Sequence, residues 1–323
     1  MSKAVFVNKY GGAEVLSYQE YHVGDPGPGE VLVRNTAIGV NYIDTYYRSG
    51  LYPAELPLIP GDQAAAVVEA AGAGVSEFKP GNRVAYASKP LGAYSQERLI
   101  DASLLVPLPE DISDEVAGAT LTRGLTAEYL THRLYELKAG ETVLVHAAAG
   151  GAGRLLCQWA DKLGARVIGT VGSKDKMDIA RQNGCSEVLL HQHDFVPQVK
   201  ELAGGQGVDI AYDSIGKATF MKSLDCIRPR GMMVSFGNAS GKPDSLDVLE
   251  LAKRGSLFLT RPTLYGYTNT RSDLLLSARR YFSAITTGML TVETGAPFAL
   301  ADAAEAHRHL EDRSIVGSPI LIP

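Results

Sequence analysis

Residues 142–160 constrain the fold of this chain more than any other segment. Residues 142–147 form a nearly continuous apolar run, interrupted only by His146, which is typical of a parallel strand buried on both faces. Residues 148–153 are all small, and a helical pattern follows at once. Without bulky side chains, backbone N–H groups and the start of the helix can approach a phosphate, where the helix dipole favours negative charge. The segment therefore predicts a phosphate-binding turn between a strand and a helix.

The spacing of this turn is close to the dinucleotide-binding pattern G-x-G-x-x-G, with Ala148 in place of the first glycine and Gly150 and Gly153 in the other two positions. Such a turn alone could equally be an ordinary connection. Further strand-like runs follow, separated mostly by helical or loop intervals, at residues 166–171, 187–190, 208–213, 231–236 and 256–261. Six strands with this rhythm predict an α/β fold, a Rossmann doubly wound parallel sheet.

The first ~120 residues differ in composition and pattern: they are rich in Gly and Pro, with short β-type runs at residues 31–37, 64–71 and 83–87. This pattern predicts a mostly β, partly closed barrel-like domain. After a helical stretch at residues 114–137 and the predicted sheet, the chain ends in two helical segments and a strand, expected at residues 269–290, 301–311 and 318–323. Because this tail does not continue the βα rhythm, we expect it to return to the first domain. The expected boundaries are residues 1–123, 124–264 and 265–323.

Composition sets further limits. A length of 323 residues favours two domains, and 45% hydrophobic content, 21% charged content and a net charge of −5 describe an ordinary globular protein with no basic footprint for nucleic acid. The N-terminus lacks the apolar segment of a signal peptide, and no window approaches the ~18 apolar residues of a membrane helix. We therefore expect a cytoplasmic protein without membrane or nucleic-acid partners. Its three cysteines, Cys157, Cys185 and Cys226, are interpreted as core residues rather than redox or metal groups.

The end of the second predicted strand indicates which dinucleotide is bound. NAD-selective sheets place an acidic residue there, about 20 residues beyond the glycine motif, but this chain has Val171. Ser173 and Lys176 follow and could bind a 2′-phosphate, with Lys174 as a third candidate. The same lysines could instead belong to a solvated helix start, and Asp175 argues against a phosphate unless it points away. On balance the segment predicts NADPH rather than NADH.

Several blocks along the whole chain then carry a family resemblance: residues 39–53, 60–62, 124–127, 146–153, 213–216, 234–238 and 317–321. With them the chain resembles the zinc-free quinone oxidoreductases of the medium-chain dehydrogenase/reductase superfamily, the group that includes zeta-crystallin. The resemblance implies a GroES-like catalytic domain with the Rossmann domain inserted into it and a cleft between them for the nicotinamide. It also implies a homodimer through the edge strand at residues 256–261, and pairing would protect that apolar edge.

The zinc-dependent relatives carry a cysteine ligand where this chain has Asn41, and a histidine-glutamate pair where it has Asp62 and Gln63. No cysteine precedes Cys157, so the first domain can assemble neither a catalytic zinc set nor a four-cysteine lobe. We therefore expect no metal. Without this Lewis acid, alcohol oxidation is disfavoured, and an acceptor that needs little polarisation is expected, such as a quinone or an activated enone.

The resemblance also implies the site residues. Asn41 and Asp44 would lie beside the nicotinamide and its ribose, with Thr126 nearby. The predicted cofactor contacts further along the chain are Ala148, Gly151, Ala152 and Gly153 for the pyrophosphate, Gly172, Ser173 and Lys176 for the 2′-phosphate, His191 for the adenine ribose, Ser214, Phe236, Gly237 and Asn238 on the path towards the nicotinamide, and Arg313 closing over the cofactor from the tail. His191 departs from the tyrosine that the family favours and could equally be a solvated loop histidine.

A cluster of tyrosines follows Asn41, and a tyrosine can stack on a quinone ring or donate a hydrogen bond to its carbonyl. Tyr46 and Tyr52 are predicted to join Asn41 in the catalytic site, facing a flat electrophilic acceptor. Tyr47 is expected to be a packed aromatic residue and Arg48 a surface charge. No dedicated general acid is required, because solvent can protonate a reduced quinone.

Three functions remain in competition. The leading hypothesis is an NADPH-dependent quinone reductase that works without zinc. The second is an alkenal or enoyl reductase, which shares the hydride donor but must also protonate carbon. The third is an NADPH-binding protein with a structural or RNA-binding role, although the acidic composition argues against RNA.

Overall fold

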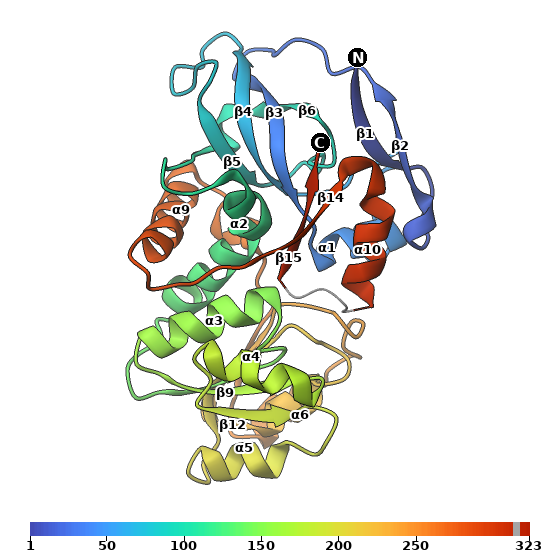
Figure 1. Ribbon diagram of the computed structural model, residues 1–323. Helices are drawn as coiled ribbons and strands as arrows, with labels where there is room; N and C mark the ends of the chain where they lie inside the picture. The colour runs from blue at the N-terminus through green and yellow to red at the C-terminus, as the bar shows by residue number, and fades with distance from the viewer. Residues whose placement is uncertain (313–316) are drawn as a thin grey trace. The chain divides into compact units, whose positions relative to one another are not determined.

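The computed structural model describes residues 1–312 and 317–323, and the chain divides into two compact units (Figure 1). Unit 1 consists of Met1–Leu125, Thr268–Thr286 and Thr291–Pro323. Unit 2 consists of Thr126–Tyr267 and Thr287–Leu290. None of the helices in the described part of the chain is both long and apolar enough to cross a membrane.

Six parallel strands form the sheet of unit 2, in the order β10-β9-β8-β11-β12-β13. The strands are β8 (Thr142–Val145), β9 (Arg166–Val171), β10 (Glu187–Leu190), β11 (Val208–Asp213), β12 (Ile227–Ser235) and β13 (Phe258–Thr260). In chain order this is 3-2-1-4-5-6, the strand order of a Rossmann sheet, and the predicted α/β fold class is confirmed. The apolar run at β8 is explained by its central place between β9 and β11.

Helices cover both faces of this sheet. α3 (Gly151–Lys162), whose buried residues include Leu155, Leu156 and Trp159, packs on β8 and β9, and α5 (Val196–Leu202) lies on the opposite face (Figure 1). A buried leucine such as Leu155 contributes about 1.5–3 kcal/mol to folding relative to an exposed one. The remaining helices and turns that belong to unit 2 are η4 (Lys174–Lys176), α4 (Met177–Gln182), α6 (Phe220–Asp225), α7 (Leu249–Lys253) and α8 (Leu264–Tyr267). The boundary at Leu125 falls within α2 (Asp114–Tyr129), which continues as the π-helical turn η3 (Leu130–Leu134).

Several element boundaries differ from the sequence prediction by a few residues, among them those of a strand and a helix. The strand expected at residues 231–236 begins earlier, because Ile227 already pairs with Val208 before Arg230 (φ 61°) interrupts the ladder. Pairing resumes at Met232, opposite Ile210. The helix expected to reach residue 290 ends at Thr286, as α9 (Arg271–Thr286). Both differences leave the ends of the strands that carry the candidate site in place.

Unit 1 is built around a seven-stranded sheet in the order β14-β15-β3-β4-β5-β7, with β6 paired to β3. Its strands are β3 (Glu30–Gly39), β4 (Gln63–Ala71), β5 (Arg83–Ala87), β6 (Glu97–Asp101), β7 (Val106–Pro107), β14 (Thr294–Ala299) and β15 (Ser318–Ile322). Neighbours are antiparallel except β14 and β15. The C-terminal strand β15 thus joins the sheet of the N-terminal segment.

Besides α9 and most of α2, unit 1 contains these further elements: β1 (Ser2–Val7), β2 (Leu16–Tyr21), α1 (Tyr42–Ser49), α10 (Ala303–Glu311) and the short turns η1 (Ala13–Val15), η2 (Ala102–Leu104) and η5 (Leu300–Asp302). β1 pairs antiparallel with β2. α10, close to the C-terminus, lies beside α1 from the N-terminal part of the chain (Figure 1). This contact between distant segments is essential for the buried network described below.

Candidate active site

The turn after β8 presents backbone donors at the carboxyl edge of the unit 2 sheet. Ala148 is fully buried, and Gly150 precedes α3 without a side-chain cap. Within residues 1–312 and 317–323, no group accepts a hydrogen bond from the N–H groups of Gly151, Ala152 or Gly153. These donors at a helix start suit a pyrophosphate.

Gly153 is required for this turn by close packing. A Cβ at this position would lie 2.2 Å from the carbonyl oxygen of Ala147, which is backbone and cannot swing away. Ala147 itself adopts φ 52°, in the left-handed region. The turn therefore brings α3 against the end of β8 at a distance that only glycine allows, and its residues fit a bound dinucleotide.

The predicted 2′-phosphate residues follow β9. Ser173 precedes the turn η4, and Lys176 at its end is half-buried. Asp175 is exposed, and a hydrogen bond from the Ser173 side chain is the main reason that the pKa of its carboxyl is lowered. The carbonyl oxygen of Gly172 accepts a hydrogen bond from Gln192 Nε2 at 2.7 Å. Lys176 thus ends the turn that follows β9, a strand whose last residue, Val171, is not acidic.

His191, directly after β10, lies against the same strand end. Its backbone N–H and its ring Nδ1 both lie 3.1 Å from the carbonyl oxygen of Val171. Because a carbonyl oxygen only accepts, Nδ1 carries the proton and donates. The ring is therefore held at the carboxyl edge of the sheet, on the side where an adenine ribose is predicted.

Ser214, Phe236, Gly237 and Asn238 come together where β11 and β12 end. The N–H groups of Phe236 and Gly237 donate to the carbonyl oxygen of Asp213 at 2.8 and 3.3 Å. A Cβ on Gly237 would lie 2.5 Å from the carbonyl oxygen of Ser214, so the two loops pack without an intervening side chain. The structure brings all predicted cofactor residues from Ala148 to Asn238 to one edge of the sheet, where open α/β sheets bind ligands. Their individual roles remain predictions.

A buried polar group underlies this edge. His146 Nδ1 lies 2.7 Å from Thr170 Oγ1, and its Nε2 lies 2.8 Å from Ser223 Oγ. Burial lowers the pKa of His146, so the ring stays neutral. The Ser223 hydroxyl donates to Asp213, whose other carboxylate oxygen accepts the N–H of Ile215. These bonds provide partners for both ring nitrogens of His146, the residue that interrupts the apolar run around β8, and they hold the loop after β11 in place.

In unit 1, Asn41 lies between β3 and α1 and is held from three directions. Its backbone N–H donates to Asp44 Oδ2 at 2.7 Å, and its side-chain Oδ1 accepts from Arg123 Nε at 3.0 Å. Its Nδ2 donates to Asp62 Oδ1 at 3.5 Å. Arg123 also donates to the carbonyl oxygen of Val40 at 2.9 Å. Because arginine only donates, it fixes the orientation of the Asn41 amide, a role that the sequence analysis missed.

Asp44 is fully buried, and its Oδ2 accepts a second hydrogen bond from the Tyr94 hydroxyl at 3.1 Å. Burial and then the nearby Asp62 carboxylate raise the pKa of Asp44 well above its usual range, and the bonds from Asn41 and Tyr94 oppose this shift. Burial and Asp44 likewise raise the pKa of Tyr94. The predicted nicotinamide site therefore includes a buried pair of acidic residues, Asp44 and Asp62.

The prediction that Arg48 is a surface charge was wrong. Its side chain is 3% exposed and binds both carboxylate oxygens of Glu311 at 2.6 and 3.0 Å. It also donates to the carbonyl oxygen of Gly11, and its Nη1 lies 3.0 Å from His307 Nδ1. Arg48 is buried because α10 covers it, and nothing in the sequence around residue 48 signals that helix.

Tyr46, Tyr47 and Tyr52 form an edge-on aromatic cluster. The Tyr52 ring lies 5.2 Å from Tyr46 and 5.7 Å from Tyr47, at 63° and 79°. Tyr47 is buried, as expected for a packed aromatic residue, whereas Tyr46 and Tyr52 remain half-exposed. Lys89 Nζ lies 5.2 Å from the Tyr47 ring, a cation that the sequence analysis did not associate with this cluster.

Two predicted cofactor residues are not part of these clusters. Thr126 lies half-buried near the end of α2. Arg313 falls outside the described residues. In the part of the chain that the structure describes, no group of three or more His, Cys, Asp or Glu residues could hold a metal ion.

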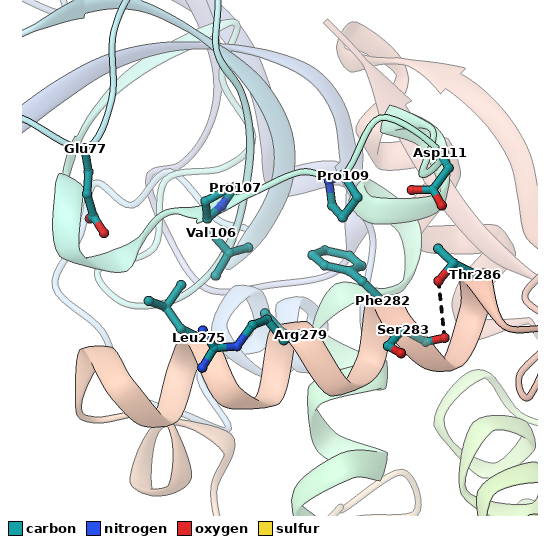
Figure 2. A pocket seen from close by; sticks show the side chains of 11 residues that line it. Glu77, Val106, Pro107, Pro109, Asp111, Leu275, Arg279, Phe282, Ser283 and Thr286 are labelled. Atoms are coloured by element: carbon teal, nitrogen blue, oxygen red, sulfur yellow. Dashed lines mark hydrogen bonds between the residues drawn. The ribbon is translucent and has the colours of Figure 1, made fainter.

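A groove of about 490 Å³ lies elsewhere on unit 1. It runs between α9, which contributes Phe282, and the segment that contains Val106 and Pro109 (Figure 2). None of the predicted site residues lines it. The groove is therefore separate from the candidate active site.

Comparisons with known proteins agree with this architecture. Residues 27–137 match the family model of the alcohol dehydrogenase GroES-like domain, and residues 151–277 match the model of zinc-binding dehydrogenases. Together they place the chain in the medium-chain dehydrogenase/reductase superfamily. The second model is named for zinc, whereas the resemblance implies that this chain has Asn41 and Asp62 at positions where zinc-dependent relatives carry metal ligands, so the expectation of no metal stays a prediction.

The relatives define the family more narrowly. The quinone oxidoreductase of Pseudomonas aeruginosa is 49% identical, and the match covers 100% of both chains. The 2-haloacrylate reductase of a Burkholderia species is 47% identical over 100% of this chain and 99% of its own. The crystal structure of Escherichia coli quinone oxidoreductase complexed with NADPH matches with a TM-score of 0.97 at 45% identity, covering 99% of this chain and 100% of that one. The chain therefore belongs to the quinone oxidoreductase family, and the predicted resemblance is confirmed.

Proposed function

We propose that this protein is an NADPH-dependent quinone reductase. The observation that carries the proposal is the carboxyl edge of the unit 2 sheet: the N–H groups at the start of α3 have no acceptor among the described residues, the turn that contains Lys176 follows β9, and no acidic residue follows β9 directly. Such an edge suits a dinucleotide with a 2′-phosphate. The related Escherichia coli enzyme that forms a complex with NADPH supports the same cofactor.

Different predicted residues bind different parts of the cofactor. In unit 2, the turn from Ala148 to Gly153 binds the pyrophosphate, and Gly172, Ser173 and Lys176 bind the 2′-phosphate. His191 contacts the adenine ribose, and the loops that carry Ser214 and residues 236–238 guide the nicotinamide end. In unit 1, Asn41 and Asp44 orient the nicotinamide and its ribose. Thr126 and Arg313 complete the predicted set.

NADPH, when bound, supplies the reducing hydride. The chain orients the acceptor and excludes water. Tyr46 and Tyr52 present aromatic faces and hydroxyl groups to a flat acceptor, and the Asn41 amide, fixed by Arg123, presents its N–H₂ group. A quinone needs no further polarisation by a metal, because its reduced form is a stable anion that solvent protonates.

A double-bond reductase is the second candidate. It is favoured by the 2-haloacrylate reductase among the relatives, whose named substrate has an activated carbon–carbon double bond. The same hydride donor would serve, but the product carbon must receive a proton. A structural or RNA-binding role remains as the non-enzymatic candidate.

The decisive experiment measures NADPH and NADH oxidation by the purified protein with a panel of quinones, 2-haloacrylate and simple enones. We expect turnover with quinones and a clear preference for NADPH. Faster turnover with the enones would favour double-bond reduction. Tight NADPH binding without turnover of any acceptor would contradict both enzymatic candidates and favour the structural or RNA-binding role, which an RNA-binding titration would then test.

We also propose a homodimer formed through β13. This strand is the edge of the unit 2 sheet, and its Phe258 and Leu259 side chains are 59% and 37% exposed. Pairing across a two-fold axis would cover these apolar groups and the unpaired edge. Sedimentation should show a dimer at micromolar concentration, and Leu259→Lys should yield monomers. The three free thiols agree with the reducing cytoplasm as its location.

A further inference from the structure

A chain of four buried side chains runs through unit 1 and ends at the candidate nicotinamide residues. Arg48 Nη1 lies 3.0 Å from His307 Nδ1, and His307 Nε2 lies 2.9 Å from the Tyr94 hydroxyl. The Tyr94 hydroxyl lies 3.1 Å from Asp44 Oδ2. None of the four is more than 3% exposed. The chain joins α1, the loop before β6 and α10, three segments that are far apart in the sequence.

The chemistry of the two ends fixes the direction of every hydrogen bond. Arg48 only donates, so His307 Nδ1 must accept, and the single proton of the neutral ring lies on Nε2. Burial and the Arg48 charge lower the pKa of His307 to about 3, which keeps the ring neutral. Nε2 therefore donates to the Tyr94 oxygen, and the Tyr94 O–H is left to donate to Asp44. Because Nδ1 of His307 accepts from Arg48 and carries no proton, this row of four side chains does not relay protons from solvent. Its effect is to orient the Tyr94 O–H towards Asp44.

The Tyr94 hydroxyl is one of only two donors to Asp44 in the described residues, the other being the Asn41 N–H at 2.7 Å. The second oxygen, Oδ1, is buried without a hydrogen-bond partner there. Asp62 opposes ionisation of Asp44, and the Arg123 charge favours it. A buried carboxylate with so few donors depends strongly on each of them.

We propose that Tyr94, aligned by His307 and Arg48, is a positioning residue of the reduction: it holds Asp44 as a carboxylate and thereby holds Asn41 in place. The proposal rests on the proposed function, in which Asn41 orients the nicotinamide. It assigns to Tyr94 and His307 no contact with cofactor or acceptor. It also explains why a histidine and a tyrosine with no surface exposure face each other at 2.9 Å.

The test compares Tyr94→Phe with Tyr86→Phe. Tyr86 is also fully buried in unit 1, and its hydroxyl donates to Asn35 Oδ1 at 2.9 Å. Asn35 in turn donates to the carbonyl oxygens of Ala93 and Ser95, so the control loosens the segment around Tyr94 without removing a donor of Asp44. We expect Tyr94→Phe alone to lower kcat with NADPH and a quinone about tenfold. The acid limb of its kcat profile should move up by about one pH unit, because Asp44 loses a donor to its charged form. NADPH affinity, dominated by unit 2, should change little.

A second measurement uses the free protein. Below the pKa of Asp44 both variants hold a neutral carboxyl, so Tyr94→Phe should lower the Tm about as much as Tyr86→Phe. As pH rises through that raised pKa, the unsupported carboxylate should make Tyr94→Phe progressively less stable than the control. His307→Gln, which keeps a donor for Tyr94, should behave more like wild type than His307→Leu, and this pair serves if Tyr94→Phe folds poorly.

The outcomes separate the two levels of inference. If wild type reduces quinones and Tyr94→Phe matches Tyr86→Phe in kcat, in the acid limb and in the pH dependence of Tm, the positioning role is wrong and the proposed function stands. If His307→Gln and His307→Leu are equally impaired, the alignment by His307 is wrong. If wild type turns over no acceptor, the proposed function fails, and the positioning role fails with it.

Discussion

The two units hold their candidate site residues by different means. Unit 2 uses backbone N–H groups at the start of α3, and small residues keep the approach clear. Unit 1 uses side chains that are buried and bonded to one another, from Asn41 and Asp44 inwards to Tyr94 and His307. A phosphate is charged wherever the protein meets it, so exposed dipoles suffice. A neutral nicotinamide and a flat acceptor need groups whose orientation and charge are fixed in advance, and burial provides this.

The largest effect is expected from a change in the backbone turn before α3, because unit 2 holds the phosphate through that turn. Gly153→Ala places a Cβ 2.2 Å from the carbonyl oxygen of Ala147, so α3 must shift. A displacement of ~1 Å should weaken NADPH binding about 100-fold, with a loss of roughly 1–3 kcal/mol in unfolding free energy. Titration of NADPH fluorescence and urea unfolding measure both.

Gly266→Ala is the matched control, because the nearest atom to its Cβ is Thr263 Oγ1 at 3.4 Å in the same unit. It should leave NADPH binding unchanged. Equal loss of binding in both variants would show that general instability, and not the turn, controls cofactor affinity.

Lys176→Glu tests the side-chain contribution in unit 2. If Lys176 binds the 2′-phosphate, replacing it by an acid should lower the ratio of kcat/KM for NADPH to that for NADH by roughly 10- to 100-fold, the scale of a charge-assisted bond. Lys200→Glu, an exposed lysine on α5, makes the same charge change as a control. An unchanged coenzyme ratio in Lys176→Glu would remove Lys176 from the site and return the lysine to a solvated helix start.

Asp44→Asn tests the buried centre of unit 1. The amide oxygen of the introduced side chain could still accept from Asn41 and Tyr94, but no charge would be buried. Since the pKa of Asp44 is raised in the folded state, wild type loses stability as pH rises through that value, and the variant does not. We therefore expect a higher Tm than wild type at pH 8, no advantage near pH 4, and kcat reduced about tenfold.

Melting curves across this pH range and steady-state kinetics check these expectations. A variant that is less stable than wild type at pH 8 would show that the Asp44 carboxylate is well compensated in the fold. Full activity would show that its charge is not needed for the reduction.

The same contrast explains what the sequence could predict. The phosphate turn, the six strands and the absence of an acid at Val171 are local patterns, and a local pattern survives without knowledge of the rest of the fold. Arg48 was misread because its partners His307 and Glu311 lie 259 and 263 residues further along the chain. Arg123 was missed for a similar reason: it follows Asn41 by 82 residues, and only the packing of α2 brings them together.

The smallest effect is expected from removing one hydroxyl group in the aromatic cluster. Tyr52→Phe keeps the ring, which packs at 5.2 Å from Tyr46 and 5.7 Å from Tyr47, and removes only the oxygen. If the hydroxyl donates to an acceptor carbonyl, kcat/KM for the quinone should fall about threefold, the effect of one neutral hydrogen bond. Tyr47→Phe changes the buried member of the same cluster and should leave the acceptor kinetics unchanged. Steady-state kinetics with several quinones at saturating NADPH distinguish the two. If Tyr52→Phe and Tyr47→Phe behave alike, the Tyr52 ring acts by stacking or not at all, and fixed orientation in unit 1 would then depend on Asn41 rather than on this tyrosine hydroxyl.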